Sequence, residues 1–217
     1  MNKNQSPAVP FQRHEVEDYE RKRYRGLDQR LVDWREKKIL KSLLDKTRMP
    51  SGLILDIPCG YGRFSELLLS RGQGLVSSDL SFPMVERSLE RRRTAGAHSG
   101  VVADAKKGLP FQNQAFSVLL SMRFFHHLHS KEDREFILKE FAAVSSKWVI
   151  LSFYRRSFFH LIQRKLRRQI KRTKTRIRMI SRERFQEEAG RAGLEIINIC
   201  PLFRGLHAQH LVLLRKD

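Results

Sequence analysis

The stretch LILDIPCGYGRF, residues 53–64, is the part of the sequence that decides the fold. An apolar run ends at Asp56, and Gly60 and Gly62 follow it one residue apart. A short apolar run bounded by proline and glycine predicts a buried strand. Glycines directly after such a strand allow a close approach of the backbone to a ligand and backbone conformations that other residues avoid. The stretch therefore predicts a strand that turns into a helix where a nucleotide-like ligand meets the backbone.

Strand and helix patterns alternate along the rest of the chain. Strands are predicted at 53–57, 74–79, 101–104, 116–122, 148–154, 194–200 and 207–216, and helices at 14–46, 62–71, 81–93, 131–144 and 181–192. Alternation predicts a parallel sheet with helices on both faces. The last two strands are joined by about six residues, too few for a parallel crossover. The predicted fold is α/β, a Rossmann-like doubly wound seven-stranded sheet, mostly parallel with the last strand antiparallel.

Length and composition set limits on the organisation of the chain. The 217 residues, of which 41% are hydrophobic, suit one globular domain with an appendage. Residues 1–48 are predicted to be a tail and a helical cap, followed by the main domain at 49–217 with a basic insertion at about 155–180. Two cysteines indicate a reducing compartment. No apolar run approaches the roughly 18 residues that cross a bilayer, so we expect a cytoplasmic protein, with peripheral contact at the inner membrane face as an option.

Acidic residues follow three of the predicted strands, at Asp56, Asp79 and Asp104. Ligands of a doubly wound sheet bind outside the carboxyl ends of its strands. An acid after the second strand can accept hydrogen bonds from ribose hydroxyls, and one after the third can accept from an adenine amino group. A dinucleotide such as NAD would call for G-x-G-x-x-G, but the third glycine is missing. The pattern describes an adenosine site of another kind.

The motif D-x-P-C-G-x-G at 56–62 resembles motif I of class I S-adenosylmethionine-dependent methyltransferases. Further segments are similar to that family, in the same order along the chain: SSDLSFPMVERS at 77–88, VVADAKKGLPFQNQAFSVLLSMRFFHHL at 101–128 and ISRERFQEEAGRAGLEIINI at 180–199. The similarity covers about residues 20–217. It extends most to small methyltransferases such as those that methylate ubiquinone and menaquinone precursors on carbon.

The resemblance implies S-adenosylmethionine as the cofactor and a role for each matching residue. Cys59, Gly60 and Gly62 would line its methionine part, with Asp56 organising the loop or contacting the ammonium group through water. Asp79 would hold the ribose, and Leu80 would pack on the adenine. Asp104 and Ala105 would meet the adenine amino group. Met122 and Arg123 would lie near the transferring methyl. The segment YERKRYRG at 19–26 would close over the cofactor.

The sequence departs from the family pattern at three places. Pro58 stands where a glycine is usual and removes a backbone N–H. Ser117 stands where an aspartate is common, and Ser145-Ser146-Lys147 replaces the turn P-G-G before the fifth strand. None of these changes removes a predicted adenosine contact, but they weaken any assignment to a subfamily.

The histidines at 126–129 raise two chemical hypotheses. His126 or His127 could act as a general base, since the ordinary pKa of histidine suits proton removal near neutral pH. A packed or solvated histidine at a strand-to-helix turn explains the same residues. No cysteine or carboxylate pattern accompanies the pair His126 and His129, so we assign no metal site. Cys59 is interpreted as a small buried residue and not as a nucleophile.

The predicted insertion is strongly basic, and the whole chain carries a net charge of +20. Arg155 to Arg178 contains eleven Lys or Arg residues and no acid, with Phe158, Ile162, Leu166 and Ile170 spaced four apart. Such a basic amphipathic helix could lie on an anionic membrane, bind RNA phosphates or pack on the protein's own sheet. The segment after the fifth strand commonly covers the acceptor pocket in the family that the chain resembles.

The favoured hypothesis is methyl transfer to oxygen or carbon of a small or lipid-linked acceptor, with an anionic membrane surface as an optional partner. Nucleic acid is disfavoured because the aromatic side chains share the apolar stripe of the insertion. The alternatives are an RNA or protein methyltransferase, and a cofactor-binding protein without turnover. The sequence leaves the acceptor and the oligomeric state open.

Overall fold

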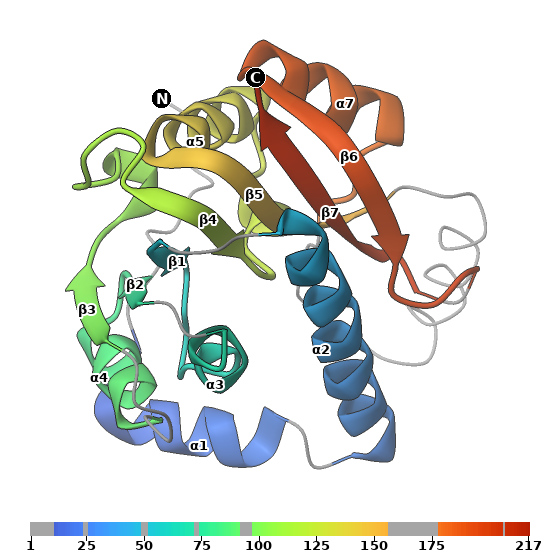
Figure 1. Ribbon diagram of the computed structural model, residues 1–217. Coiled ribbons are helices and arrows are strands. Elements are labelled where there is room, and N and C mark those ends of the chain that lie inside the picture. Colours follow the sequence, from blue (N-terminus) through green and yellow to red (C-terminus); the bar gives the residue numbers. More distant parts are fainter. Residues whose placement is uncertain are drawn as a thin grey trace, which may run out of the picture.

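The computed structural model describes residues 11–23, 26–48, 52–71, 74–91, 97–155, 178–205 and 207–217 (Figure 1). Seven strands form one sheet in the order β3-β2-β1-β4-β5-β7-β6. Their bounds are β1 Ile54–Asp56, β2 Leu75–Asp79, β3 His98–Val102, β4 Phe116–Ser121, β5 Ser145–Tyr154, β6 Leu194–Pro201 and β7 Gln209–Lys216. The pairs from β3 to β5 are parallel, and β7 is antiparallel to both of its neighbours. The predicted fold, including the reversed last strand, is confirmed.

Helices cover both faces of the sheet (Figure 1). Their bounds are α1 Arg13–Arg23, α2 Leu27–Thr47, α3 Ser65–Leu69, α4 Phe82–Glu90, α5 Lys131–Val144 and α7 Arg182–Arg191. Successive side chains of a strand point to opposite faces, so Leu119 packs with the helices α5 and α7 while Val118 and Leu120 pack with α2 and α3. The two core layers pack against opposite faces of the sheet and so hold the strand ends in place beside one another.

The N-terminal region differs from the predicted single helix over residues 14–46. It forms two helices, because Gly26 adopts an extended conformation at the N-cap of α2. Leu31 and Trp34, two apolar residues within the predicted helix, lie outside the buried face of α2 and are 51% and 54% exposed. The buried face is instead formed by Glu36, Ile39, Leu40, Leu43 and Leu44, together with Thr47.

Two local predictions after β1 and β2 also need correction. The helix predicted over 62–71 is shortened to α3, because Gly60 and Gly62 take positive φ values of 52° and 76° and extend the turn. Ser81, the first residue of the helix predicted over 81–93, occupies the N-cap of α4, but its side chain makes no capping hydrogen bond. Its Oγ donates instead to the backbone oxygen of Phe11 at 2.9 Å.

Most of the predicted basic insertion, residues 156–177, lies outside the described residues. Its flanks, Arg155 and Ile180, form an isolated parallel bridge beside the end of β5. Among the helices that the structure describes, none has the length and apolar character required to span a bilayer.

Candidate active site

A cavity of about 240 Å³ opens at the carboxyl ends of β1, β2 and β4. Its lining residues are Phe11, Tyr19, Pro58, Cys59, Gly60, Tyr61, Arg63, Phe64, Asp79, Met84, Met122, Arg123, Phe124 and His127. The strand order puts β1 between β2 and β4, so the connections of these strands diverge here. This is the topological switch point at which such sheets bind ligands.

Asp79, at the end of β2, presents its carboxylate to this cavity. Oδ2 accepts from the backbone N–H of Gly60 at 3.0 Å, and Oδ1 accepts from the backbone N–H of Ser81 at 3.0 Å. Burial raises the pKa of Asp79, and the N–H groups of Ser81 and Gly60 lower it in part. A carboxylate has about four acceptor positions, so the two backbone bonds leave capacity for two hydroxyl donors.

Asp56, at the end of β1, lies beneath the cavity and does not line it. Its side chain is 1% exposed, and neither carboxylate oxygen has a hydrogen-bond partner. Burial raises the pKa of Asp56 to about 8; Arg63 opposes this rise and Asp79 adds to it. The structure therefore shows no hydrogen bond through which Asp56 would organise the loop, and leaves it as a buried acceptor below the cavity.

The two glycines of the motif have different surroundings. A Cβ on Gly60 would meet no heavy atom within 4 Å, so its open side leaves room for a ligand. A Cβ on Gly62 would lie 2.7 Å from the Cα of Ser88. Gly62 therefore packs against α4 and does not line the cavity. Burial raises the pKa of the Cys59 thiol, and Asp56 and Asp79 raise it further, which agrees with the interpretation of Cys59 as a packed residue and not a nucleophile.

Three predicted adenine contacts are absent from the lining of this cavity. Leu80 is half-buried directly after Asp79. Asp104 follows β3, and its Oδ1 accepts from the backbone N–H of Lys106 at 3.1 Å. Ala105, in the short 3₁₀ helix η1 (Ala105–Lys107), is buried against the core. Their roles in binding stay predictions.

Met122 and Arg123 follow β4 and both line the cavity. Met122 is buried, whereas Arg123 adopts a left-handed conformation with φ of 57°. Its guanidinium donates Nε to Oε1 and Nη2 to Oε2 of Glu36, both at 2.9 Å. Arg123 is thus held by a residue of α2.

Of the two candidate bases, His127 lines the cavity. His126 is 9% exposed and packs its ring on His127 and Tyr154, at centroid distances of 4.0 and 4.8 Å. Burial lowers the pKa of His127, and the nearby His129 and Lys106 lower it further. A neutral imidazole at physiological pH can accept a proton, so His127 is the better placed of the two. The general-base role stays a prediction.

The helix α1 contributes to the wall of the cavity. Val16, Tyr61 and Met84 form a small cluster with Tyr19, whose ring lies 5.3 Å from that of Phe11. The sequence predicted that the segment 19–26 closes over the cofactor, but Phe11 and Tyr19 were not singled out as wall residues. Their signal was weak, because they occur in a charged segment without regular apolar spacing.

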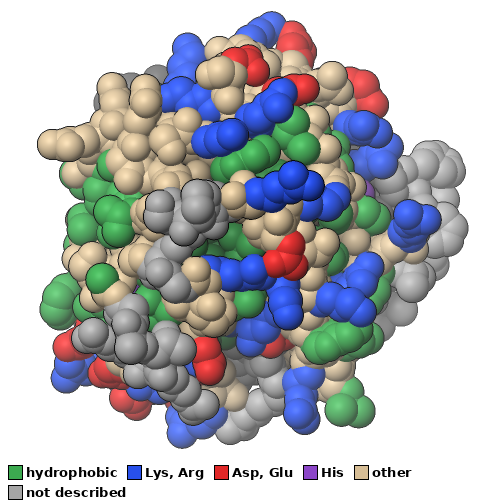
Figure 2. Space-filling view, viewed as in Figure 1, with side chains coloured by type: hydrophobic (Ala, Val, Ile, Leu, Met, Phe, Trp, Pro, Cys, Tyr) green, Lys and Arg blue, Asp and Glu red, His purple; other side chains and the backbone are tan. Residues whose placement is uncertain are grey.

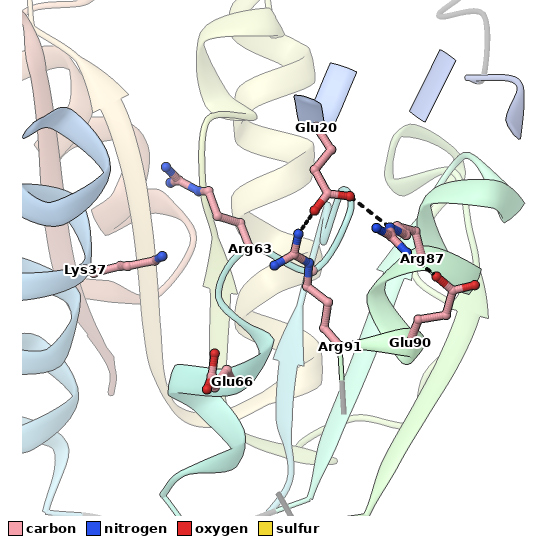
Figure 3. A pocket seen from close by; sticks show the side chains of 8 residues that line it. Glu20, Lys37, Arg63, Glu66, Arg87, Glu90 and Arg91 are labelled. Carbon is pink, nitrogen blue, oxygen red and sulfur yellow. Dashed lines mark hydrogen bonds and ion pairs between the residues drawn. The ribbon is translucent and has the colours of Figure 1, made fainter. Parts of the chain in front are cut away.

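Ion pairs fasten α1 to α4 behind the motif loop. Figure 3 shows Glu20 of α1 between Arg87 and Arg91, at the C-terminal end of α4. Arg91 also donates Nε to the backbone oxygen of Tyr61 at 3.0 Å. A second bridge joins Arg13 and Glu86 at 2.6 Å. Arg91 thus connects α1 with the loop that follows β1. Glu20, Arg87 and Arg91 border a second, more polar cavity of about 390 Å³.

Glu36 is the functional residue that sequence reasoning missed most clearly. It is fully buried, and it contacts Arg63 and Arg123, which line the cavity. A signal was present in the sequence: Glu36 occupies the same helix face as Ile39, Leu40 and Leu43. A carboxylate on an apolar face indicates a buried ionic partner.

Part of the sequence matches a known family. Residues 55–152 match the family described as "Methyltransferase domain". The chain contains a methyltransferase domain. The matched segment runs from β1 to β5 and therefore includes Asp79, Met122 and the candidate His127, whereas α1, α2 and the last two strands lie outside it.

Curated proteins that are similar in sequence share one name. "Probable tRNA methyltransferase 9B" from Homo sapiens is 34% identical over 95 residues, which cover 44% of this chain and 19% of that protein. The mouse protein of the same name is 32% identical over the same length. This chain therefore aligns with about a fifth of the length of these curated relatives.

Solved structures share the fold across nearly the whole chain. Magnesium protoporphyrin IX methyltransferase from Synechocystis, with bound S-adenosylhomocysteine, has a TM-score of 0.74 at 17% identity and covers 95% of this chain and 100% of its own. A methyltransferase in complex with the Trm112 activator of Haloferax volcanii has a TM-score of 0.66 at 16% identity, covering 94% and 98%. The prediction of a class I S-adenosylmethionine-dependent methyltransferase domain is confirmed, whereas the resemblance to quinone methyltransferases stays a prediction.

Proposed function

We propose that this chain transfers a methyl group from S-adenosylmethionine to RNA. The observation that carries the methyl-transfer proposal is the cavity lined by Gly60 and Asp79, at the switch point of a methyltransferase fold. Its features fit the cofactor: Asp79 has spare acceptor positions for ribose hydroxyls, Gly60 has open space, and Asp56 holds two unpaired buried oxygens. The cofactor supplies an activated methyl group on a sulfonium.

The remaining steps belong to the chain's own residues. Asp79 and the backbone around Gly60 would bind and orient the cofactor. Tyr19, Met122 and Phe124 would exclude water from the cavity, which favours an in-line approach of the acceptor. Where the acceptor atom carries a proton, the neutral His127 would take it.

RNA is favoured as the acceptor for two reasons. The relatives at 32–34% identity are named as probable tRNA methyltransferases, and the chain carries a net charge of +20. Figure 2 shows many Lys and Arg side chains spread over the face that it presents, with Asp and Glu side chains mainly near its upper edge and at its lower left. A surface of this kind attracts phosphate backbones in a salt-dependent manner. A cytoplasmic location is part of this proposal.

A second candidate is transfer to oxygen or carbon of a small or lipid-linked acceptor. The observation in its favour is a row of exposed apolar side chains on α2, with Leu27 at 82%, Leu31 at 51% and Trp34 at 54% exposure. Lys38 lies over the ring of Trp34 at 5.1 Å. Apolar residues beside cations on one helix face suit contact with an anionic membrane surface.

The two candidates are separated by following labelled methyl groups. The purified protein is incubated with methyl-labelled S-adenosylmethionine and, separately, with bulk tRNA, anionic lipid extract or a small-molecule extract. RNase-sensitive label that is lost in Asp79→Ala supports RNA, and label in the organic phase or the small-molecule fraction supports the second candidate. Cofactor binding without transfer to any fraction would contradict both and favour a cofactor-binding protein without turnover.

A further inference from the structure

The buried carboxylate of Glu36 connects two walls of the cavity from a helix outside the matched methyltransferase domain. Its Oε2 lies 2.6 Å from Nη2 of Arg63, which belongs to the loop after β1. The same carboxylate receives the paired hydrogen bonds from Arg123 after β4. Gln209 of β7 donates Nε2 to Oε1 at 2.6 Å. Three hydrogen bonds and the ion pair with Arg63 therefore converge on a side chain with no exposed surface.

The charges of this cluster bear directly on the cavity. Arg63 and Arg123 line it, whereas Glu36 does not. Asp33, one helical turn before Glu36, adds a second acid at 3.1 Å from Arg63 and also pairs with Lys37. Burial alone would raise the pKa of Glu36, but Arg63 and Arg123 outweigh it and lower the pKa. The carboxylate therefore remains negative and offsets positive charge at the cavity wall.

That offset matters because the two forms of the cofactor differ in charge. S-adenosylmethionine carries a positive sulfonium, and its product S-adenosylhomocysteine is a neutral thioether. Two arginines without a buried counter-charge would repel the sulfonium more than the thioether. The two molecules have nearly the same shape, so a difference in their affinity for the cavity would come mainly from electrostatic interactions.

We propose that Glu36 is a specificity-determining positioning residue, which neutralises Arg63 and Arg123 so that the cavity accepts the cationic substrate form of the cofactor alongside the neutral product. This inference rests on the proposed use of S-adenosylmethionine. It assigns α2 to the cofactor site, although α2 precedes the matched domain.

The test is the ratio of the two dissociation constants, measured by calorimetry on the full chain. In Glu36→Gln, we expect the affinity for S-adenosylmethionine to fall roughly tenfold and that for S-adenosylhomocysteine roughly threefold or less, because one unit of charge is removed near the sulfonium. A merely structural role would weaken both ligands equally and leave the ratio unchanged. That unchanged ratio, in a folded variant, would overturn the proposal.

The chain offers a matched control in a second buried ion pair. Arg134 of α5 and Glu188 of α7 are both 1% exposed or less, and their paired contacts are 2.6 and 2.8 Å long. Neither residue lines the cavity. Glu188→Gln should lower the melting temperature as a broken buried pair does, but should leave the ratio of the two affinities unchanged.

Two further variants keep the proposal testable if Glu36→Gln does not fold. Arg123→Gln removes a positive charge instead, so the ratio should shift the opposite way, toward S-adenosylmethionine. The double variant Glu36→Gln/Arg123→Gln restores the charge balance and should return the ratio toward that of the wild type. An affinity ratio in Arg123→Gln that stays unchanged or shifts toward S-adenosylhomocysteine would contradict the proposal. If the wild-type protein binds neither molecule, the proposed function itself fails.

Discussion

Asp56 and Asp79 end two neighbouring parallel strands, and their surroundings are opposite. Asp79 faces the cavity and accepts from two backbone N–H groups at 3.0 Å. Asp56 is 1% exposed and both of its oxygens lack hydrogen-bond partners. The register pairs Asp56 with Ser77, two residues before Asp79, so Asp56 lies deeper in the sheet. The same sequence pattern, an acidic residue at the end of a strand, therefore gives a hydrogen-bonded carboxylate at the cavity in one case and a buried carboxyl group without partners in the other.

The difference indicates that Asp79 would recognise the cofactor through directed hydrogen bonds, whereas Asp56 would respond to the positive charge of the cofactor. Asp79 has fixed donors and spare acceptor positions, so it can recognise hydroxyl groups with defined geometry. Asp56 has a pKa raised to about 8 by burial, so it is largely protonated at neutral pH without a ligand. A cation bound above it would change that state. The following predictions separate these roles.

The largest expected effect is on cofactor affinity in Asp79→Ala. The variant removes the acceptor for the ribose hydroxyls and releases the N–H of Gly60. Hydrogen bonds to charged groups contribute about 1.5–3 kcal/mol each, so affinity for S-adenosylmethionine should fall about 100-fold, measured by calorimetry. Asp79→Asn keeps one acceptor oxygen and should lose less. Equal binding by wild type and Asp79→Ala would remove Asp79 from the site.

The second expected effect is a gain of stability in Asp56→Asn. A buried carboxyl with no hydrogen-bond partner opposes folding once it ionises, and asparagine has nearly the same shape without a charge. We expect the free energy of unfolding without ligand to rise by roughly 2 kcal/mol at pH 8, measured by denaturant titration. A less stable variant at this pH would show that the Asp56 charge is favourable in the folded protein.

The pH dependence of that gain follows from the direction of the pKa shift. The folded pKa of Asp56 is raised to about 8, well above the roughly 3.9 of an unfolded chain. Between these values the folded state holds a proton that the unfolded state has lost, so stability falls as pH rises through this window. The advantage of Asp56→Asn should therefore grow from pH 4 to pH 8 and stay constant above it.

The sequence predicted the strands and their acids well because both depend on local patterns. Apolar runs that end at Asp56 and Asp79 are enough to place the cavity at the carboxyl ends of the sheet. The sequence could not show how deeply each acid lies, because burial depends on strand register and on the packing of Gly62 against Ser88. Glu36 was missed for a related reason: its partners Arg63 and Arg123 are 27 and 87 positions away, so their approach is a property of the fold.

A third prediction concerns proton release when the cofactor binds. Both the sulfonium and the ammonium of S-adenosylmethionine are positive, and a positive charge near Asp56 favours its ionised form. Binding at pH 7 should release up to about one proton, measured by calorimetry in buffers of different ionisation enthalpy. The release should vanish in Asp56→Asn and should decline above pH 8, where Asp56 is already ionised. Equal release by wild type and Asp56→Asn would assign the proton to another group.

The smallest expected effect belongs to the third acid, Asp104. It lies after β3, is not in the lining of the cavity, and already accepts from the N–H of Lys106 at 3.1 Å. Asparagine can keep that backbone bond and still accept one bond from an adenine amino group. Asp104→Asn should therefore weaken S-adenosylmethionine binding by about threefold or less, since one hydrogen bond contributes only about 1 kcal/mol. An inosine analogue, which lacks the amino group, should bind wild type and Asp104→Asn alike. A loss as large as that of Asp79→Ala would mean that Asp104 closes onto the cofactor, and that all three strand ends take part in recognition.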